Sequence, residues 1–286
     1  MIAALRLLPK NALSRLAGRI VSLRLPALLQ RWQIRGFARV VGIDWSEVRD
    51  PVTSFLSLQE FFVRALRPGS RPLDPDPDAF VSPCDGAWGE SGLVKEGMLL
   101  QVKGRPYSLG ALLGDDASAE HFEGGSYATL YLSPRDYHRF HAPCDARVAK
   151  LRYLPGTLWP VNRAGIEGVD GLFAQNERIC SFMDLPGPGG RNALCIVAVG
   201  ATLVGKVRVT FDSLASNLPR AAMEERIYGE EAPRLAKGEE WGRFEFGSTL
   251  VVVAGPGIVE LERQEPGTSV RVGTRIGALQ RVGEST

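Results

Sequence analysis

The chain has 286 residues, of which 44% are hydrophobic and 23% charged, with a formal net charge of +2. This length and apolar content are typical of a globular protein with one sizeable core, and they exclude an intrinsically disordered chain. The charge is uneven, because residues 1–43 contain eight basic and no acidic side chains, whereas the remainder holds 26 basic and 32 acidic ones. The chain therefore consists of a basic N-terminal segment, residues 1–43, which we call the head, and a mildly acidic remainder, which we call the body.

The head contains a predicted amphipathic helix over residues 10–25. A proline bounds this segment on each side, and Asn11 is a candidate N-cap. Apolar residues recur at helical spacing, while Arg15 and Arg19 fall on another face. The apolar positions are Leu13, Leu16, Ile20 and Leu23.

We expect this head to lie on an anionic membrane surface. It lacks an apolar run long enough to span a bilayer and the features of a signal peptide. Each basic side chain near an anionic leaflet contributes roughly 1 kcal/mol, so eight of them with a leucine face can hold the protein there without lipidation. The alternatives are packing of the helix on its own body or in a dimer, and nucleic-acid binding, which is disfavoured because the arginines alternate with leucines and not with base-stacking aromatics.

A proline- and aspartate-rich link, residues 68–78, separates the head from a body that reads mostly as strands. We divide the chain into a basic amphipathic helical membrane-binding region, residues 1–67, and a β-rich domain, residues 68–286. The expected fold class is α+β, with a body of mainly antiparallel β-sheet like a sandwich or barrel and an N-terminal helical region. Strands are predicted over residues 127–132, 193–199, 201–209 and 249–253.

The four cysteines are expected to stay reduced, because the chain shows no secretion signal. The spacing of His138, His141 and Cys144 is compatible with zinc ligands. No CxxC pair or second ligand cluster completes such a site, so we expect no metal.

Three short segments carry side chains suited to catalysis. Near the C-terminus, Ser248 follows Gly247 and opens an apolar, strand-like run. The second segment contains His138 and His141, and in the third Asp85 lies in a tight Pro-x-Asp-Gly turn. Taken singly, each has an ordinary interpretation, because Gly-Ser-Thr and Asp-Gly are typical of turns and histidines are common polar groups. Together they supply a nucleophile, a base and a carboxylate.

These groups fit a protein that cleaves its own chain. The Ser248 hydroxyl can attack the carbonyl of Gly247 if a base takes its proton and donors stabilise the oxyanion. His141 is the candidate base, and Asp85 is the carboxylate that would fix its tautomer. The attack converts the peptide bond to an ester. β-Elimination of the acyl group and hydrolysis then turn the serine into a terminal pyruvoyl group and release ammonia.

Such a group would make the protein an enzyme without a bound cofactor. A pyruvoyl carbonyl forms a Schiff base with an amine substrate and accepts the electrons released when a carboxylate leaves, as pyridoxal phosphate does.

The chain resembles bacterial phosphatidylserine decarboxylases, self-cleaving pyruvoyl-dependent proenzymes that convert phosphatidylserine to phosphatidylethanolamine and carbon dioxide. The resemblance covers about residues 80–260, and the joint order of its six segments is more specific than any one of them. One position departs from the family pattern, since Phe246 stands where leucine is usual. The matching segments are residues 83–86, 131–141, 155–162, 176–178, 199–201 and 242–249.

The resemblance implies roles for four residues. Asp85, His141 and Ser248 would form the charge relay for self-cleavage, and Ser248 would become the covalent pyruvoyl group. His138 would take part in decarboxylation or in substrate binding. Residues 68–286 would then be the catalytic domain.

The resemblance also implies partners and a location. Cleavage would give mature chains of residues 1–247 and 248–286, associated as a heterodimer. The substrate would be phosphatidylserine, met at the cytoplasmic side of the cell membrane by a peripheral protein. A homo-oligomer stays open, and no nucleic-acid partner is expected.

Two other classes of function are compatible with parts of the sequence. A Ser/His/Asp hydrolase acting at the membrane surface would use the same side chains, but the chain has no Gly-x-Ser-x-Gly elbow and its serine opens a strand. A noncatalytic, membrane-attached β module would explain the basic head but would leave the histidine segment without a role.

Overall fold

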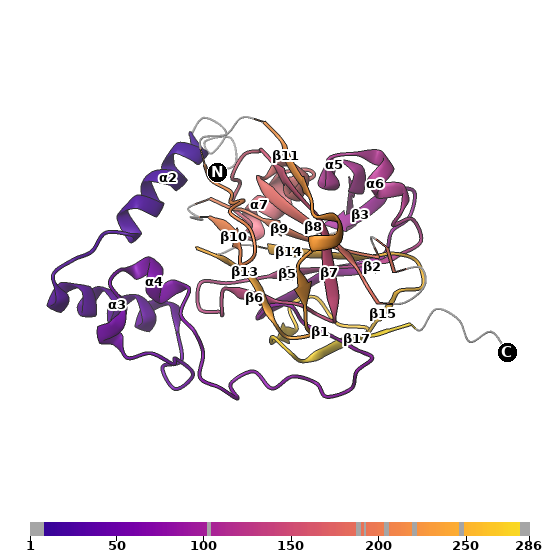
Figure 1. Ribbon diagram of the computed structural model, residues 1–286. Coiled ribbons are helices and arrows are strands. Elements are labelled where there is room, and N and C mark those ends of the chain that lie inside the picture. Colours follow the sequence, from indigo (N-terminus) through magenta and orange to yellow (C-terminus); the bar gives the residue numbers. More distant parts are fainter. Residues whose placement is uncertain are drawn as a thin grey trace.

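The computed structural model describes residues 9–101, 104–186, 190–191, 193–202, 206–218, 222–245 and 249–280. The N-terminal helices lie to one side of a β-rich body, as Figure 1 shows in indigo and purple. They are α2 (Lys10–Val21), α3 (Ala27–Val41) and α4 (Leu58–Phe62), with a 3-10 turn, η1 (Val52–Ser54), between the last two. The expected N-terminal helical region is confirmed.

The helix boundaries in this region follow from proline and glycine. Pro9 and Pro26 stand at the N-caps of α2 and α3, and Gly42 ends α3 with a positive φ of 82°. The prediction of Asn11 as an N-cap is wrong, because the helix begins at Lys10. The Asn11 side-chain amide instead donates to the carbonyl of Gly156 at 2.9 Å, which ties α2 to the body.

In the described part of the chain the main sheet has nine strands, and all its pairings are antiparallel. β14 lies near its middle, between β9 and β5. In spatial order the strands are β11 (Glu224–Ile227), β7 (Ala146–Leu154), β8 (Arg178–Asp184), β9 (Leu194–Val199), β14 (Thr249–Ala254), β5 (Ser126–Tyr131), β2 (Gly86–Leu93) and β16 (Ser269–Val270), and β12 (Arg234–Leu235) also pairs with β7.

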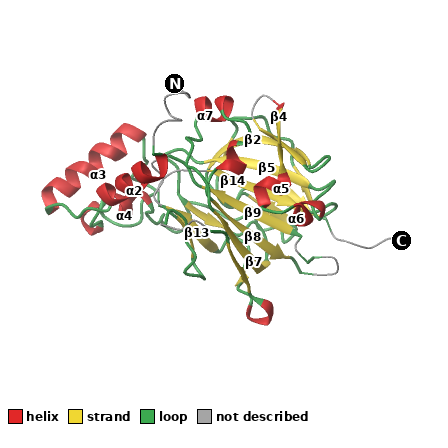
Figure 2. Ribbon diagram, turned by 90° about the horizontal axis from the view of Figure 1, so that it is seen from above, coloured by secondary structure: helices red, strands yellow, loops and turns green. Residues whose placement is uncertain are grey.

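Smaller elements cover both faces of this sheet. One three-stranded sheet consists of β1 (Ala79–Val81), β17 (Arg275–Leu279) and β15 (Val259–Leu261), and another of β10 (Val207–Val209), β13 (Glu240–Phe244) and β6 (Arg139–His141). The remaining elements are the hairpin β3 (Met98–Gln101) and β4 (Arg105–Ser108), the short helices α5 (Leu109–Leu113), α6 (Asp116–Glu120), α7 (Arg163–Gly168) and α8 (Leu172–Gln175), and the turn η3 (Gly229–Glu231). Figure 2 shows α5 and α6 over the strands.

The two covered faces explain why β14 is apolar throughout. Leu250 and Val252 belong to one buried cluster, which includes the core residues of the small sheets. Val251 and Val253 belong to the cluster on the opposite face, with residues of α5 and α8. Side chains alternate across a strand, so a strand covered on both faces is hydrophobic at every position.

The predicted α+β class with mainly antiparallel sheet is confirmed, and within the described residues the main sheet is open and not a closed barrel. Three of the predicted strands are observed as β5, β9 and β14, with ends within about a residue. The predicted strand over residues 201–209 is wrong at its start. Ala201 and Thr202 lie in a loop, where the Thr202 hydroxyl donates to the carbonyl of Leu158, and β10 begins only at Val207.

Candidate active site

The register of the main sheet brings the catalytic segments of the sequence to one edge. β2 and β14 run in the same direction on either side of β5, where Tyr131 pairs with both Thr249 and Ala87. Asp85 immediately precedes β2, and Ser248 immediately precedes β14 in the sequence. β5 ends in this same row at Tyr131, so the histidine segment leaves the sheet there.

Ser248 itself lies, with Phe246 and Gly247, outside the described residues. The described chain stops at Glu245, at the end of β13, and resumes at Thr249, which opens β14. Both flanking residues are buried. The site is therefore built from the residues that surround this tripeptide.

β6 directly follows His138, ends at His141 and pairs with β13. The backbone N–H of Phe244 donates to the carbonyl of His138 at 2.9 Å, which places His138 beside the strand that leads into the tripeptide. The N–H of His141 donates to the carbonyl of Pro83 at 2.7 Å, which places His141 beside the Asp85 turn. The fold thus places His138 beside the end of β13, and His141 between the start of β13 at Glu240 and the Asp85 turn.

His141 has the hydrogen bonds of a neutral base. Its Nδ1 donates to the carbonyl of Gly238 at 2.8 Å, so Nε2 carries the lone pair and lies 3.3 Å from the Tyr137 hydroxyl. Burial lowers the pKa of His141 below its usual value, and it raises the pKa of Tyr137 to about 12, so the tyrosine keeps its proton. The imidazole is ready to accept a proton at Nε2 near neutral pH.

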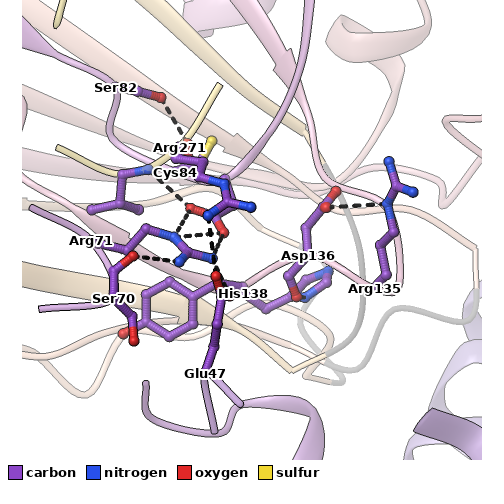
Figure 3. A network of polar contacts seen from close by, with 12 residues as sticks. Glu47, Ser70, Arg71, Ser82, Cys84, Arg135, Asp136, His138 and Arg271 are labelled. Atoms are coloured by element: carbon purple, nitrogen blue, oxygen red, sulfur yellow. Dashed lines mark hydrogen bonds and ion pairs between the residues drawn. The ribbon is translucent and has the colours of Figure 1, made fainter. Parts of the chain in front are cut away.

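Asp85 is held by an arginine of the link and not by a histidine. Its carboxylate, on a residue only 5% exposed, accepts from Arg71 Nε at 2.8 Å and from the backbone N–H of Val272 at 2.9 Å. Arg71 also pairs with Glu47 at 2.9 Å and donates to the carbonyl of Ser70, as Figure 3 shows. The carbonyl of Gly238, and not Asp85, fixes the tautomer of His141 here, although the negative charge of Asp85 acts to raise the pKa of His141.

His138 is fully buried and neutral. Its ring centroid lies 4.0 Å from that of Phe62 in α4, and its Nδ1 donates to the carbonyl of Asp136 at 2.9 Å. Burial, with a smaller effect from the Arg64 charge, lowers the pKa of His138 to about 3. Its Nε2 is buried with no hydrogen-bond partner among the described residues. His138 therefore offers an unused acceptor beside β13.

The N-terminal helices supply residues to this site that the sequence did not single out. Arg64, just after α4, donates to the carbonyls of Arg135 and Asp136 at 2.9 and 3.2 Å and so holds the loop before His138. Gln59 donates to the Glu245 carboxylate at 2.6 Å.

One sequence signal could have identified Arg64 beforehand. It directly follows the apolar run 61–63, and a charged residue in such a place calls for a partner. Arg71 carried no such signal, because the Pro/Asp-rich link around it looked like an exposed connection.

Comparison with known proteins agrees with this arrangement. The family model described as phosphatidylserine decarboxylase matches residues 58–278, a span that begins at α4. Three relatives carry the name phosphatidylserine decarboxylase proenzyme. The protein from Anaeromyxobacter sp. (strain K) is 47% identical over 96% of this chain and 97% of its own, that from Brevibacillus brevis 41% identical over 86% and 85%, and that from Myxococcus xanthus 37% identical over 96% of both.

The matched span includes the Asp85 turn, the histidine segment and the Gly247-Ser248 bond. The similarity covers nearly the full length of both chains in two of these three pairs. The chain belongs to the phosphatidylserine decarboxylase family.

Proposed function

We propose that this protein decarboxylates phosphatidylserine to phosphatidylethanolamine and is made as a proenzyme that cuts itself between Gly247 and Ser248. The observation that carries the proposal is the convergence of the Asp85 turn, the histidine segment and both flanks of that bond at one sheet edge, in a chain of this family. The decarboxylase names of the relatives support this reading over a membrane-surface hydrolase or a noncatalytic module.

Self-cleavage begins with the Ser248 hydroxyl, which loses its proton to Nε2 of His141 and attacks the Gly247 carbonyl carbon. The C–N bond breaks, the nitrogen of residue 248 takes a proton, and an ester joins Gly247 to the serine oxygen. Loss of the α-proton expels the Gly247 carboxylate by β-elimination. Water then replaces the nitrogen, ammonia leaves, and a pyruvoyl group remains at the new N-terminus.

Asp85 and His141 have separate tasks in this step. The Gly238 carbonyl orients the imidazole, and Asp85 stabilises the positive charge that the ring gains on taking the proton. Arg71 and the Val272 N–H hold the Asp85 carboxylate in place.

The described residues around position 248 fit a pyruvoyl group. The Thr249 hydroxyl and Nε2 of His138 are buried, and both lack a hydrogen-bond partner in the described part of the chain. The hydroxyl can donate to a carbonyl, and Nε2 can accept from an amine. When formed, the group supplies a carbonyl that condenses with the substrate amine and an electron sink for the bond that loses carbon dioxide.

We assign His138 to substrate binding and decarboxylation. With a pKa of about 3 it stays neutral, so its Nε2 can accept a hydrogen bond from the substrate amine. The Phe62 ring covers the imidazole and keeps water from it. A dry environment favours loss of carbon dioxide, because the carboxylate charge is poorly solvated there and spreads into the electron sink as neutral carbon dioxide leaves.

We further propose that the protein is peripheral to the cytoplasmic side of the cell membrane. No helix in the described ranges is long and apolar enough to cross a bilayer. The leucine stripe of α2 is exposed, with Leu16 and Ile20 52% and 53% accessible. Exposed leucines next to arginines support binding to an anionic leaflet more than packing on the body.

The test is a mass measurement of the purified protein under denaturing, reducing conditions, together with carbon dioxide release from phosphatidylserine. We expect fragments of residues 1–247 and 248–286, the smaller with a pyruvoyl N-terminus. Ser248→Ala should give one intact chain without activity. An intact chain in active wild-type protein would refute the proposal, and efficient cleavage in His141→Ala would remove His141 from the relay.

A further inference from the structure

A cavity of about 680 Å³ lies between α2 and the body, next to the end of β13. In Figure 1, α2 stands beside β10 and β13 at this place. The cavity is lined from three directions: by one face of α2, by Gln59 of α4, and by the strands and loops of the body. The residues that matter for its charge are Arg15, Arg19, Lys206, Arg208 and Glu245.

The cavity has an excess of positive charge. Its single carboxylate, Glu245, accepts from Arg208 Nε at 2.7 Å and from Gln59 Nε2 at 2.6 Å, so that charge is already paired. Among the salt bridges of the described residues, none joins a carboxylate to Arg15, Arg19 or Lys206, although Arg15 interacts electrostatically with the buried Glu177. Three cations therefore face a cavity whose one anion is occupied, an arrangement that suits an anionic ligand.

The cavity is lined by Glu245, the last described residue before the reacting position in the chain. Glu245 precedes Ser248 by three residues, and its backbone N–H donates to the carbonyl of Lys206 at 2.7 Å. The serine head group of the substrate separates its amine from its phosphorus by only a few bonds. When the substrate amine is at residue 248, the phosphodiester group therefore lies near Glu245 and the basic side chains of the cavity.

α2 presents a different surface on each side of the cavity. Arg15, Arg19 and Ser22 recur at i, i+4 and i+7 and line the cavity, whereas Lys10 and Ser14 are buried on another side. The exposed leucine stripe lies about a quarter to a third of a turn from the cavity face, at 100° per residue. Leu23 belongs to both, so acyl chains can extend along the stripe while a phosphate occupies the cavity.

We propose that Arg15, Arg19 and Lys206 form the binding site for the phosphodiester of the glycerophospholipid substrate. The identity of the lipid in this inference rests on the proposed function. The binding of an anionic phosphodiester group rests on the charges of the cavity alone. Under this proposal α2 contributes residues to the substrate site in addition to its proposed contact with the membrane.

Binding can be measured without a pyruvoyl group by using full-length Ser248→Ala protein. Calorimetric titration with dihexanoyl phosphatidylserine below its micellar concentration removes the membrane from the experiment. Adding Arg15→Gln and Arg19→Gln should raise the Kd by about 100-fold, because each lost charge-assisted hydrogen bond costs about 10-fold. The matched control, Lys95→Gln with Arg263→Gln, removes two charges outside the cavity lining and should change the Kd by less than about 2-fold.

Lys206→Gln provides a second variant on the body side of the cavity and should raise the Kd by about 10-fold if the α2 double variant unfolds. Inorganic phosphate, titrated in parallel, should bind more weakly than the lipid. A Kd for the lipid that is unchanged in both cavity variants would overturn the proposal. Equal affinity for inorganic phosphate and the lipid would overturn the lipid assignment and leave a free-anion site.

The cleaved protein gives a second readout. Its KM for the same short-chain lipid should rise in step with the Kd, with kcat and the extent of self-cleavage changed by less than about 2-fold. If no form of the protein releases carbon dioxide but the Kd changes as expected, the proposed function fails and the binding site stands. If decarboxylation occurs with unchanged KM and Kd in the variants, only the binding site is refuted.

Discussion

Among the described residues, Arg71 is the cation that hydrogen-bonds to the buried carboxylate of Asp85. Arg71→Met should lower the free energy of unfolding by about 3–5 kcal/mol, since it leaves a buried charge without its partner. It should also slow self-cleavage, because the carboxylate is no longer fixed. Urea unfolding on a Ser248→Ala background measures the first effect on one uncut chain, and the rate of fragment formation measures the second.

The double variant Arg71→Met with Asp85→Asn separates these effects. Removing both charges should restore most of the lost stability, because Asp85 is no longer charged and Glu47 keeps its ion pair with Arg271, but it should not restore cleavage. Equal stability of Arg71→Met and wild type would show that the pair contributes nothing. Recovery of cleavage in the double variant would show that the Asp85 charge is dispensable.

His138 should make stability depend on pH in a defined direction. Its folded-state pKa is about 3, whereas the unfolded chain has the ordinary value of about 6.5. The unfolded state binds the proton first, so this contribution is complete above pH 6.5 and is lost as pH falls from there toward 3. At pH 5 the free energy of unfolding should be about 2 kcal/mol lower than at pH 8 from this group alone.

His138→Gln, also on the Ser248→Ala background, is the comparison that isolates this contribution. The variant should lose less stability than its parent between pH 8 and pH 5, measured by urea unfolding at each pH. Carboxylates titrate in both proteins and cancel in the difference. If both proteins lost the same free energy of unfolding between pH 8 and pH 5, the assignment of a depressed pKa to His138 would be contradicted.

Among the elements, α4 connects the N-terminal region to the site most directly. Phe62 packs on the His138 ring, Arg64 holds the preceding loop, and Gln59 binds the Glu245 carboxylate. Gln59 also accepts a hydrogen bond from Ser22, just after α2. If α2 binds the membrane as proposed, a movement of α2 can reach Glu245, the residue before the cleavage segment, through the Ser22 and Gln59 side chains.

The exposed stripe of α2 gives a prediction at this same scale. Leu16→Glu with Ile20→Glu should weaken sedimentation with phosphatidylglycerol vesicles by about 10-fold or more, because two apolar side chains leave the bilayer interface and two negative charges approach it. The fold should tolerate both changes, since the two side chains are about half exposed.

The control is Leu93→Glu with Ile227→Glu, which alters two exposed apolar residues of the body. These changes should leave vesicle binding within about 2-fold of wild type. Turnover of short-chain substrate in solution should stay within about 2-fold of wild type in this control variant. Equal vesicle binding by the two double variants would exclude the stripe as the membrane contact.

At the scale of the whole molecule, the sequence predicts the features that depend on residues close together in the chain. The apolar composition of β5, β9 and β14 predicts strands, which the structure confirms. The relay of Asp85, His141 and Ser248 stays a prediction. The Arg71 pairing with Asp85 and the Gln59 contact with Glu245 join residues 14 and 186 positions apart. No local pattern encodes such contacts, because they depend on how the N-terminal helices pack against the finished sheet.

The strand order also determines whether the two fragments stay associated after cleavage. β14 pairs with β5 on one side and β9 on the other, β16 pairs with β2, and β17 pairs with β1, so the short product is paired with the long one at three strands. Burying the four central side chains of β14 contributes roughly 6–12 kcal/mol at about 1.5–3 kcal/mol each. Cleavage at the strand entrance breaks none of these contacts.

We therefore expect residues 1–247 and 248–286 to remain together as a heterodimer without a disulfide, since the cysteines are buried as free thiols in the long fragment. Native mass spectrometry should give the mass of both fragments together, and denaturant without reductant should separate them. Uncut Ser248→Ala protein should elute with the cleaved wild type in gel filtration, because the sheet is the same before and after the cut. Loss of the small fragment during native gel filtration would show that β14 is held by its covalent link and not by its neighbouring strands.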